Sequence, residues 1–261
     1  MATTQDTFRG TGFVEVTPDI FPVLSGTLGN YAFYTCPNLK SVHLSLITST
    51  GNRTFGSCPN LEYVKLDNVT NMYTNASYPA FVNCTSLKEV HLPAYSGNIV
   101  ANWLNGLTAL EVVDIPYAQV IVTNAFKGCT SLSKVNFPFL SNVQGNAFSG
   151  CTELREVELG TENNAKITLT LSTNAFLNCT NLSKLTIYYD IMASLANAST
   201  IFNGTGITAT TGSILVPAKL LSAYKSAVNW SNYKDRIYPL SPIFYIRGVS
   251  QTMTASSQTL A

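Results

Sequence analysis

The chain has 261 residues with 15 Lys and Arg against 14 Asp and Glu, and only 11% of its residues are charged. This balance argues against a nucleic-acid ligand, because such ligands need a basic surface that neutralises phosphates. Apolar residues make up 46% of the chain, yet no stretch approaches the roughly 18 consecutive apolar residues that predict a membrane-spanning helix, so we expect no membrane insertion.

The first ten residues, MATTQDTFRG, contain neither a basic segment nor an apolar core. A secretory signal peptide needs both of these features. The sequence therefore predicts either a protein that is not secreted or a chain whose leader has been removed.

From Phe8 onward the chain repeats one frame. The copy NAFKGCTSLSKVNFP at 124–138 is matched by YAFYTCPNLKSVHLS at 31–45, NAFSGCTELREVELG at 146–160 and several others. Nine anchor positions, about 24 residues apart, predict nine coils of a repeat fold. These anchors are Phe8, Phe33, Phe55, Phe81, Leu104, Phe126, Phe148, Phe176 and Phe202.

Within each copy the pattern L-x-x-V-x-L ends in an alternation of apolar and polar residues, which predicts a short strand. These strands return only every 22 to 28 residues. Hairpins have turns of about two to five residues, so the strands cannot form a hairpin array. We expect them to stack in parallel, about 4.8 Å apart, as the coils of a solenoid.

The frame A-F-x-x-C-x-x-L-x-x-V-x-L-P resembles the BspA-type leucine-rich repeat, and about residues 8–217 carry it. The resemblance implies a right-handed leucine-rich-repeat solenoid, with a parallel β-sheet on one face, that occupies residues 1–217. It also implies a binding or adhesion role without catalytic residues. Longer coils place extra loops at Asn71–Tyr78, Glu162–Lys166 and Ala193–Ser199.

After Pro217 the repeat ends, and residues 218–241 predict a C-terminal cap. Leu220, Leu221, Tyr224 and Val228 have helical spacing. A solenoid end exposes apolar coil interior, so an amphipathic helix is expected to cover it. The composition of residues 242–261 becomes rich in Ser and Thr, which is typical of a linker or of the start of a truncated module. The rest of the lid is expected to be Trp230, Tyr233 and Ile237.

The cysteines share one repeat position, three residues after the anchor. Equivalent positions in stacked coils form a column rather than converging pairs. We therefore favour a ladder of buried free thiols over adjacent disulfides or a metal site, since zinc needs converging ligands. No metal or other cofactor is expected. The ladder consists of Cys36, Cys58, Cys84, Cys129, Cys151 and Cys179.

The outward strand positions form a mixed polar surface whose charges could simply set coil register, or could contact a partner. Aromatic residues just after the strands could bind sugars or a protein, or could pack the coil corners. His43 and His91 are two coils apart, too far for one zinc ion. Asp114 and Glu158 share a flat face that offers no pocket for glycoside hydrolysis. The candidate binding residues are Tyr63, Lys65, His91, Asp114, Tyr117, Asn136, Phe139, Glu158, Tyr188 and Tyr189.

The sequence therefore predicts a non-enzymatic binding module rather than an enzyme. The resemblance favours adhesion by an extracellular bacterial surface protein, with a host protein, matrix or glycan as the partner. The second hypothesis is a structural or receptor-binding component of a phage particle, which would place the chain in a virion.

Overall fold

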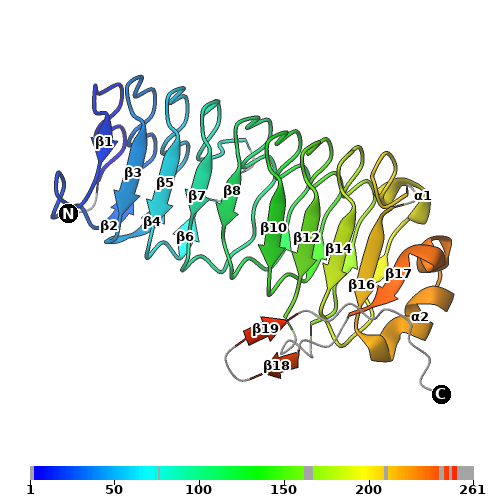
Figure 1. Ribbon diagram of the computed structural model, residues 1–261. Coiled ribbons are helices and arrows are strands. Elements are labelled where there is room, and N and C mark those ends of the chain that lie inside the picture. The colour runs from blue at the N-terminus through cyan, green and yellow to red at the C-terminus, as the bar shows by residue number, and fades with distance from the viewer. Residues whose placement is uncertain are drawn as a thin grey trace, which may run out of the picture.

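The computed structural model describes residues 3–73, 75, 77–161, 167–208, 211–240, 244–246 and 249–251. Its main body is a solenoid of parallel coils, and Figure 1 shows the long strands aligned along one face. The parallel leucine-rich-repeat solenoid predicted from the sequence is confirmed. The predicted loop Glu162–Lys166 lies outside the described residues.

The sheet face is built by one strand from each coil, but it is divided into two sheets. The strands from the first five anchors, Phe8 to Leu104, form one parallel sheet. Its strands, in spatial order, are β1 (Glu15–Val16), β3 (Ser41–Leu44), β5 (Tyr63–Leu66), β7 (Glu89–His91) and β8 (Val112–Asp114).

The second parallel sheet continues the face and ends at the C-terminal lid. The described residues show no strand pairing between β8 and the first strand of this sheet, an interruption that the repeat pattern does not predict. The strands are β10 (Lys134–Phe137), β12 (Glu156–Leu159), β14 (Lys184–Ile187), β16 (Ser213–Val216) and β17 (Ile237–Pro239).

Two narrower parallel sheets, also absent from the sequence-based prediction, follow the main strands in each coil. The parallel pairing of Val120–Ile121 with Asn142–Val143 holds the coils together across the division. One coil earlier, Ile99 forms a parallel bridge with Ile121. The first sheet contains β2 (Gly26–Leu28), β4 (Ile47–Thr50) and β6 (Asn71–Met72). The second contains β9 (Val120–Ile121), β11 (Asn142–Val143), β13 (Thr170–Leu171) and β15 (Ser194–Leu195).

A stack of buried aromatic rings runs through the core. The anchor rings of neighbouring coils lie nearly parallel, with centroids 5.0 Å apart for Phe126 and Phe148 and 5.5 Å apart for Phe148 and Phe176. In the coil whose anchor is Leu104, the adjacent Trp103 contacts Phe81 at 6.0 Å in a tilted arrangement, and the parallel stacking resumes between Phe126 and Phe148. Each coil therefore buries its anchor against the next one, which is the main apolar contact between repeats.

The turn that precedes each anchor explains a second repeated residue. Asn124, Asn146 and Asn174 have φ values of 59°, 56° and 59°. This left-handed region disfavours most side chains but is tolerated by Asn. Asn therefore recurs two residues before the anchor because the backbone turns sharply there.

The cysteines form a column of buried free thiols. Each thiol donates a hydrogen bond to the anchor carbonyl of the preceding coil. The Sγ to O distance is 3.0 Å from Cys58 to Phe33 and also from Cys151 to Phe126. A carbonyl can accept two hydrogen bonds. The Phe126 carbonyl also accepts from the Cys129 amide at 3.1 Å, and the thiol supplies a weak second donor within a small volume. The repeated cysteine thus links consecutive coils. Thr11 and Thr205 instead donate to the anchor carbonyl of their own coil.

Alkylation of the native protein with iodoacetamide is expected to modify Cys36 first. When Cys36 ionises, the Cys58 S–H can turn from the Phe33 carbonyl to the Cys36 thiolate, and this hydrogen bond lowers the pKa of Cys36. Burial instead raises the pKa of Cys84 to about 12 and that of Cys129 well above its ordinary value. A mass-spectrometric time course at neutral pH measures the order. Cys36→Ser should remove the fast phase, and equal rates for all six thiols would contradict this prediction.

The C-terminal lid covers the last coil. It consists of a 3-10 turn η1 (Ala218–Leu220), α2 (Leu221–Ser226) and a second 3-10 segment η2 (Trp230–Arg236), which precedes β17. A four-residue helix, α1 (Ala198–Ile201), lies in the last long coil. None of the described helices is long and apolar enough to span a membrane. Figure 1 shows α2 against the end of the second sheet.

The lid residues behave as predicted with one exception. Tyr224, Trp230, Tyr233 and Ile237 are buried, but Val228 is 84% exposed. The expected packing of Val228 is wrong because α2 ends at Ser226, so the helical spacing does not reach it. Most of residues 242–261 lie outside the described residues, where only the antiparallel pair β18 (Phe244–Ile246) and β19 (Val249–Gln251) is described.

Candidate functional site

The outward side chains of the sheet face form columns whose order matches the repeat alignment. In the first sheet His43, Lys65, His91 and Asp114 are register partners on successive strands. In the second sheet Asn136 and Glu158 are partners, and Glu158 also pairs with Thr186 of β14. The strands thus present the predicted face residues together, but the division of the sheet separates Asp114 from Asn136.

Charges on the first sheet face neutralise one another. Lys88 Nζ lies 2.7 Å from Glu62 Oε2, and this contact lowers the pKa of Glu62 and raises that of Lys88. Partial burial opposes ionisation of Asp67, but hydrogen bonds from His43 and Lys65 hold its pKa below the ordinary value. The distances to the Asp67 carboxylate are 2.9 Å from His43 Nε2 and 3.2 Å from Lys65 Nζ.

Charges on the second sheet face are paired in the same way. Lys134 Nζ lies 3.4 Å from Glu156 and 3.0 Å from Glu158, and these carboxylates raise the pKa of Lys134 against its partial desolvation. Lys184 Nζ lies 3.8 Å from the other Glu156 oxygen. Exposed pairs of this kind contribute little to stability, about 0–1 kcal/mol each. They leave a surface without a strong field of either sign.

The centre of the first sheet carries a small aromatic patch within this polar face. The rings of Tyr63 on β5 and His91 on β7 are 5.4 Å apart. Val112 on β8 is exposed and is the register partner of Glu89, which in turn pairs with Tyr63. His91 also contacts Glu89 at 3.0 Å and Asp114 at 3.5 Å. We call Tyr63, His91 and Val112 the face patch.

The two histidines of the sheet face do not lie together. Lys65 stands between His43 and His91 in the strand register, so the histidines do not converge. Within the described residues no group of three His, Cys, Asp or Glu side chains could hold a metal ion. The arrangement can offer rings, hydrogen bonds and paired charges to a partner surface.

The aromatic residues after the strands divide into exposed and buried members. Tyr117 and Phe139 follow β8 and β10, and their rings stack 5.4 Å apart, as expected from the repeat spacing. They are 48% and 36% exposed. Tyr188 is partly exposed. Tyr117 and Phe139 therefore form a ring pair on the surface.

The expectation that Tyr189 lies on the exposed rim is wrong, because this residue is fully buried. Its hydroxyl donates to the Leu140 carbonyl at 2.6 Å, and burial raises its pKa. Gly160 makes room for the ring, since a Cβ at this position would lie 3.0 Å from it. Gly160 occupies the position of Pro116 and Pro138 in other coils and is the sequence signal for this inward turn.

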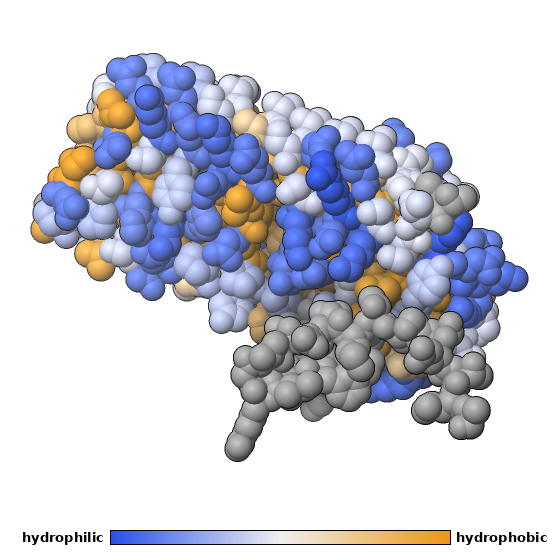
Figure 2. All heavy atoms as spheres, in the orientation of Figure 1, coloured by the Kyte–Doolittle hydropathy of each residue, from blue (hydrophilic) through white to orange (hydrophobic). Residues whose placement is uncertain are grey.

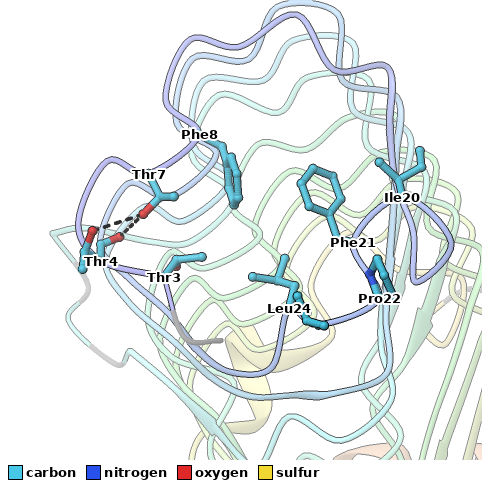
Figure 3. A pocket seen from close by; sticks show the side chains of 9 residues that line it. Thr3, Thr4, Thr7, Phe8, Ile20, Phe21, Pro22 and Leu24 are labelled. Atoms are coloured by element: carbon cyan, nitrogen blue, oxygen red, sulfur yellow. Dashed lines mark hydrogen bonds between the residues drawn. The ribbon is translucent and has the colours of Figure 1, made fainter.

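The N-terminal end of the solenoid contains an open apolar hollow of about 470 Å³, which the sequence analysis did not predict. Figure 3 shows Phe8 and Phe21 facing each other across its mouth, with Leu24 nearby. Phe8 stacks on Phe33 at 4.9 Å, so the hollow is the uncovered end of the core rather than a separate cavity. Its lining residues are Thr3, Thr4, Thr7, Phe8, Ile20, Phe21, Pro22, Val23 and Leu24.

Comparison with known proteins relates the chain to a repeat family. The model of the BspA type leucine rich repeat region matches residues 5–118 and 97–218. No curated protein matches the chain.

Solved structures with similar folds have low sequence identity. A T. pallidum leucine rich repeat protein is 23% identical, with 69% of this chain and 82% of that chain covered and a TM-score of 0.49. A leucine-rich repeat protein from Bacteroides ovatus is 18% identical, with coverage of 92% and 69% and a TM-score of 0.45. A leucine rich cell surface protein from Faecalibacterium prausnitzii is 17% identical, with coverage of 78% and 76% and a TM-score of 0.34.

Proposed function

The chain belongs to the BspA-type leucine-rich repeat family, and from this premise we propose that it is a non-enzymatic binding module on an extracellular bacterial surface. Its partner would be a host protein or matrix protein that docks on the first sheet face. Family membership supports the extracellular setting, and the face patch supports the position of the contact.

The observation that carries this proposal is the face patch at the middle of an uncovered sheet. Figure 2 shows the sheet side as largely hydrophilic with small hydrophobic areas. Interfaces between proteins commonly combine a few aromatic anchors with a polar rim. Tyr63 and His91 supply the rings, and the pairs Glu62–Lys88 and Lys65–Asp67 supply such a rim.

The shape of this face favours a macromolecular partner over a small substrate. Small-molecule sites enclose most of the ligand, whereas these side chains stand on a broad sheet. Because the charges are already paired, a partner gains little by bringing charge of one sign. Affinity is therefore expected to depend on the rings and on shape.

Replacing Tyr63 and His91 together by alanine is expected to weaken binding to a host matrix protein by about tenfold or more. The reason is that the double substitution removes the paired rings that act as the interface anchor. Surface plasmon resonance against purified collagen, laminin and other matrix proteins measures the affinity. Lys134→Ala/Asn136→Ala, on the second sheet, is the matched control and should bind like the unmodified chain. The assignment would be refuted if the unmodified chain and the two variants bound with equal affinity, or if none of them bound a matrix protein.

A further inference from the structure

The rim of the solenoid after β8 and β10 carries an open hollow that is separate from the face patch. Its volume is about 400 Å³, within the range of small-ligand sites, about 300–1,000 Å³. We infer that this hollow binds a neutral glycan, with the Tyr117–Phe139 ring pair as its apolar surface. We call it the rim site, and its lining residues are Ser96, Tyr117, Gln119, Phe139, Ser141 and Ile167.

The exposure of the ring pair is not explained by packing. Corners of other coils are filled by Tyr95 and Tyr189, which are buried and donate their hydroxyls to the carbonyls of Asn98 at 2.8 Å and Leu140 at 2.6 Å. Tyr117 occupies the same repeat position as Tyr189, yet its ring remains half exposed. The rim therefore keeps two stacked rings in contact with solvent where other coils turn theirs inward.

Uncharged polar groups surround these rings. The side chains of Ser96 and Gln119 and the Tyr117 hydroxyl have no hydrogen-bond partner among the described residues, so they are available to a ligand. Ser141 donates its hydroxyl to the Gln119 carbonyl at 3.0 Å and still has lone pairs that can accept. The rim site thus offers both donors and acceptors beside apolar rings.

The backbone holds these groups in fixed positions. The Ser141 amide donates to the Gln119 carbonyl at 2.8 Å, and the Thr170 amide donates to the Ser141 carbonyl at 2.9 Å. These bonds belong to the ladder between coils, so the side chains that follow one another along the rim are spaced by the repeat. A site whose groups are fixed before binding loses less conformational entropy when a ligand arrives.

The chemistry of the rim site fits a neutral sugar better than a charged ligand. Its described lining contains no Lys, Arg, His, Asp or Glu, so these six residues offer no charged group to sulfate, phosphate or carboxylate. A pyranose has apolar C–H faces that pack on aromatic rings and hydroxyls that exchange hydrogen bonds with amide and hydroxyl groups. The lining comes from four successive coils, and a hollow of this extent can hold neighbouring units of an oligosaccharide.

The test measures binding of the full chain to an array of neutral, sialylated and sulfated glycans, followed by calorimetry with the neutral oligosaccharides that bind, such as cellohexaose, chitohexaose or maltohexaose. Tyr117→Ala is expected to lower affinity by about tenfold or more, a usual threshold for a contact that carries binding energy. Tyr117→Phe keeps the ring, so its loss of affinity should be smaller than that of Tyr117→Ala. Gln119→Ala should also weaken binding of the glycan.

Controls separate this site from the face patch and from loss of folding. Tyr63→Ala/His91→Ala should bind the glycan like the unmodified chain, so the two proposals fail independently. Each variant is compared by circular dichroism, and affinities are expressed per folded molecule. The inference is overturned if no neutral glycan binds below millimolar concentration, if only charged glycans bind, or if Tyr117→Ala leaves the affinity unchanged. It is also overturned if Tyr117→Ala instead changes the oligomeric state in light scattering, since the rings would then serve a second copy.

Discussion

Phe148→Ala is expected to lower the free energy of unfolding by about 3–5 kcal/mol, the usual cost of removing a buried aromatic ring. The Phe148 ring is fully buried and lies between Phe126 at 5.0 Å and Phe176 at 5.5 Å. Alanine would leave a cavity between two coils that cannot close without shifting both. Urea denaturation followed by circular dichroism measures the loss.

Two other substitutions test the cause of this loss. Phe148→Leu retains most of the apolar volume and should cost less than Phe148→Ala. Phe139→Ala removes an aromatic ring that is 36% exposed and should change the free energy of unfolding by less than about 1 kcal/mol. If Phe148→Ala were as mild as Phe139→Ala, the ring stack would not be the main contact between coils.

Trp230→Ala is expected to destabilise the C-terminal end by about 3–5 kcal/mol and to promote aggregation. The Trp230 indole N–H donates to the Ala193 carbonyl at 2.7 Å, and its ring packs edge to face on Tyr224 at 5.0 Å. The substitution removes the donor from a buried carbonyl and opens the apolar interior of the last coil. Thermal unfolding and light scattering measure the two effects.

Variants within the same lid serve as references. Trp230→Phe loses the hydrogen bond but keeps a ring, so its cost should be smaller. Val228→Ala alters a side chain that is 84% exposed, so it should melt like the unmodified protein. If Trp230→Ala unfolded at the same temperature as the unmodified protein, the lid would not protect the solenoid end.

The repeat alignment alone predicts the coil number, the parallel strands and the residues that share each outward column. His43, Lys65 and His91 are register partners because each holds the same position in its own copy. A periodic sequence predicts these neighbours because equivalent residues of successive coils pack in equivalent environments. The thiol-to-carbonyl bonds were not predicted, since a pattern shows that a cysteine recurs but not which group it contacts.

The repeat alignment does not predict features that depend on differences between neighbouring coils. Tyr117 and Tyr189 occupy one repeat position, but Gly160 in the adjacent coil opens a space that only Tyr189 enters. The interruption between β8 and β10 also falls between copies with intact apolar patterns, Leu110/Val113/Ile115 and Leu132/Val135/Phe137. The rim site depends both on the outward Tyr117 ring and on the interruption of the sheet. It therefore could not be predicted from the repeat pattern and is seen only in the three-dimensional structure.

The divided sheet face also has a mechanical consequence. Where β8 and β10 have no strand pairing, the main sheet face of the solenoid is joined less tightly, while β9 and β11 keep the narrower sheet paired. A rod weakened on one side bends at that place, so the junction is expected to act as a hinge between two stiffer arms. The rings of Tyr117 and Phe139 lie on either side of this junction. Because the Ser141 amide bonds to the Gln119 carbonyl beside these rings, bending at the junction is expected to open the main sheet face and to leave the rim site intact.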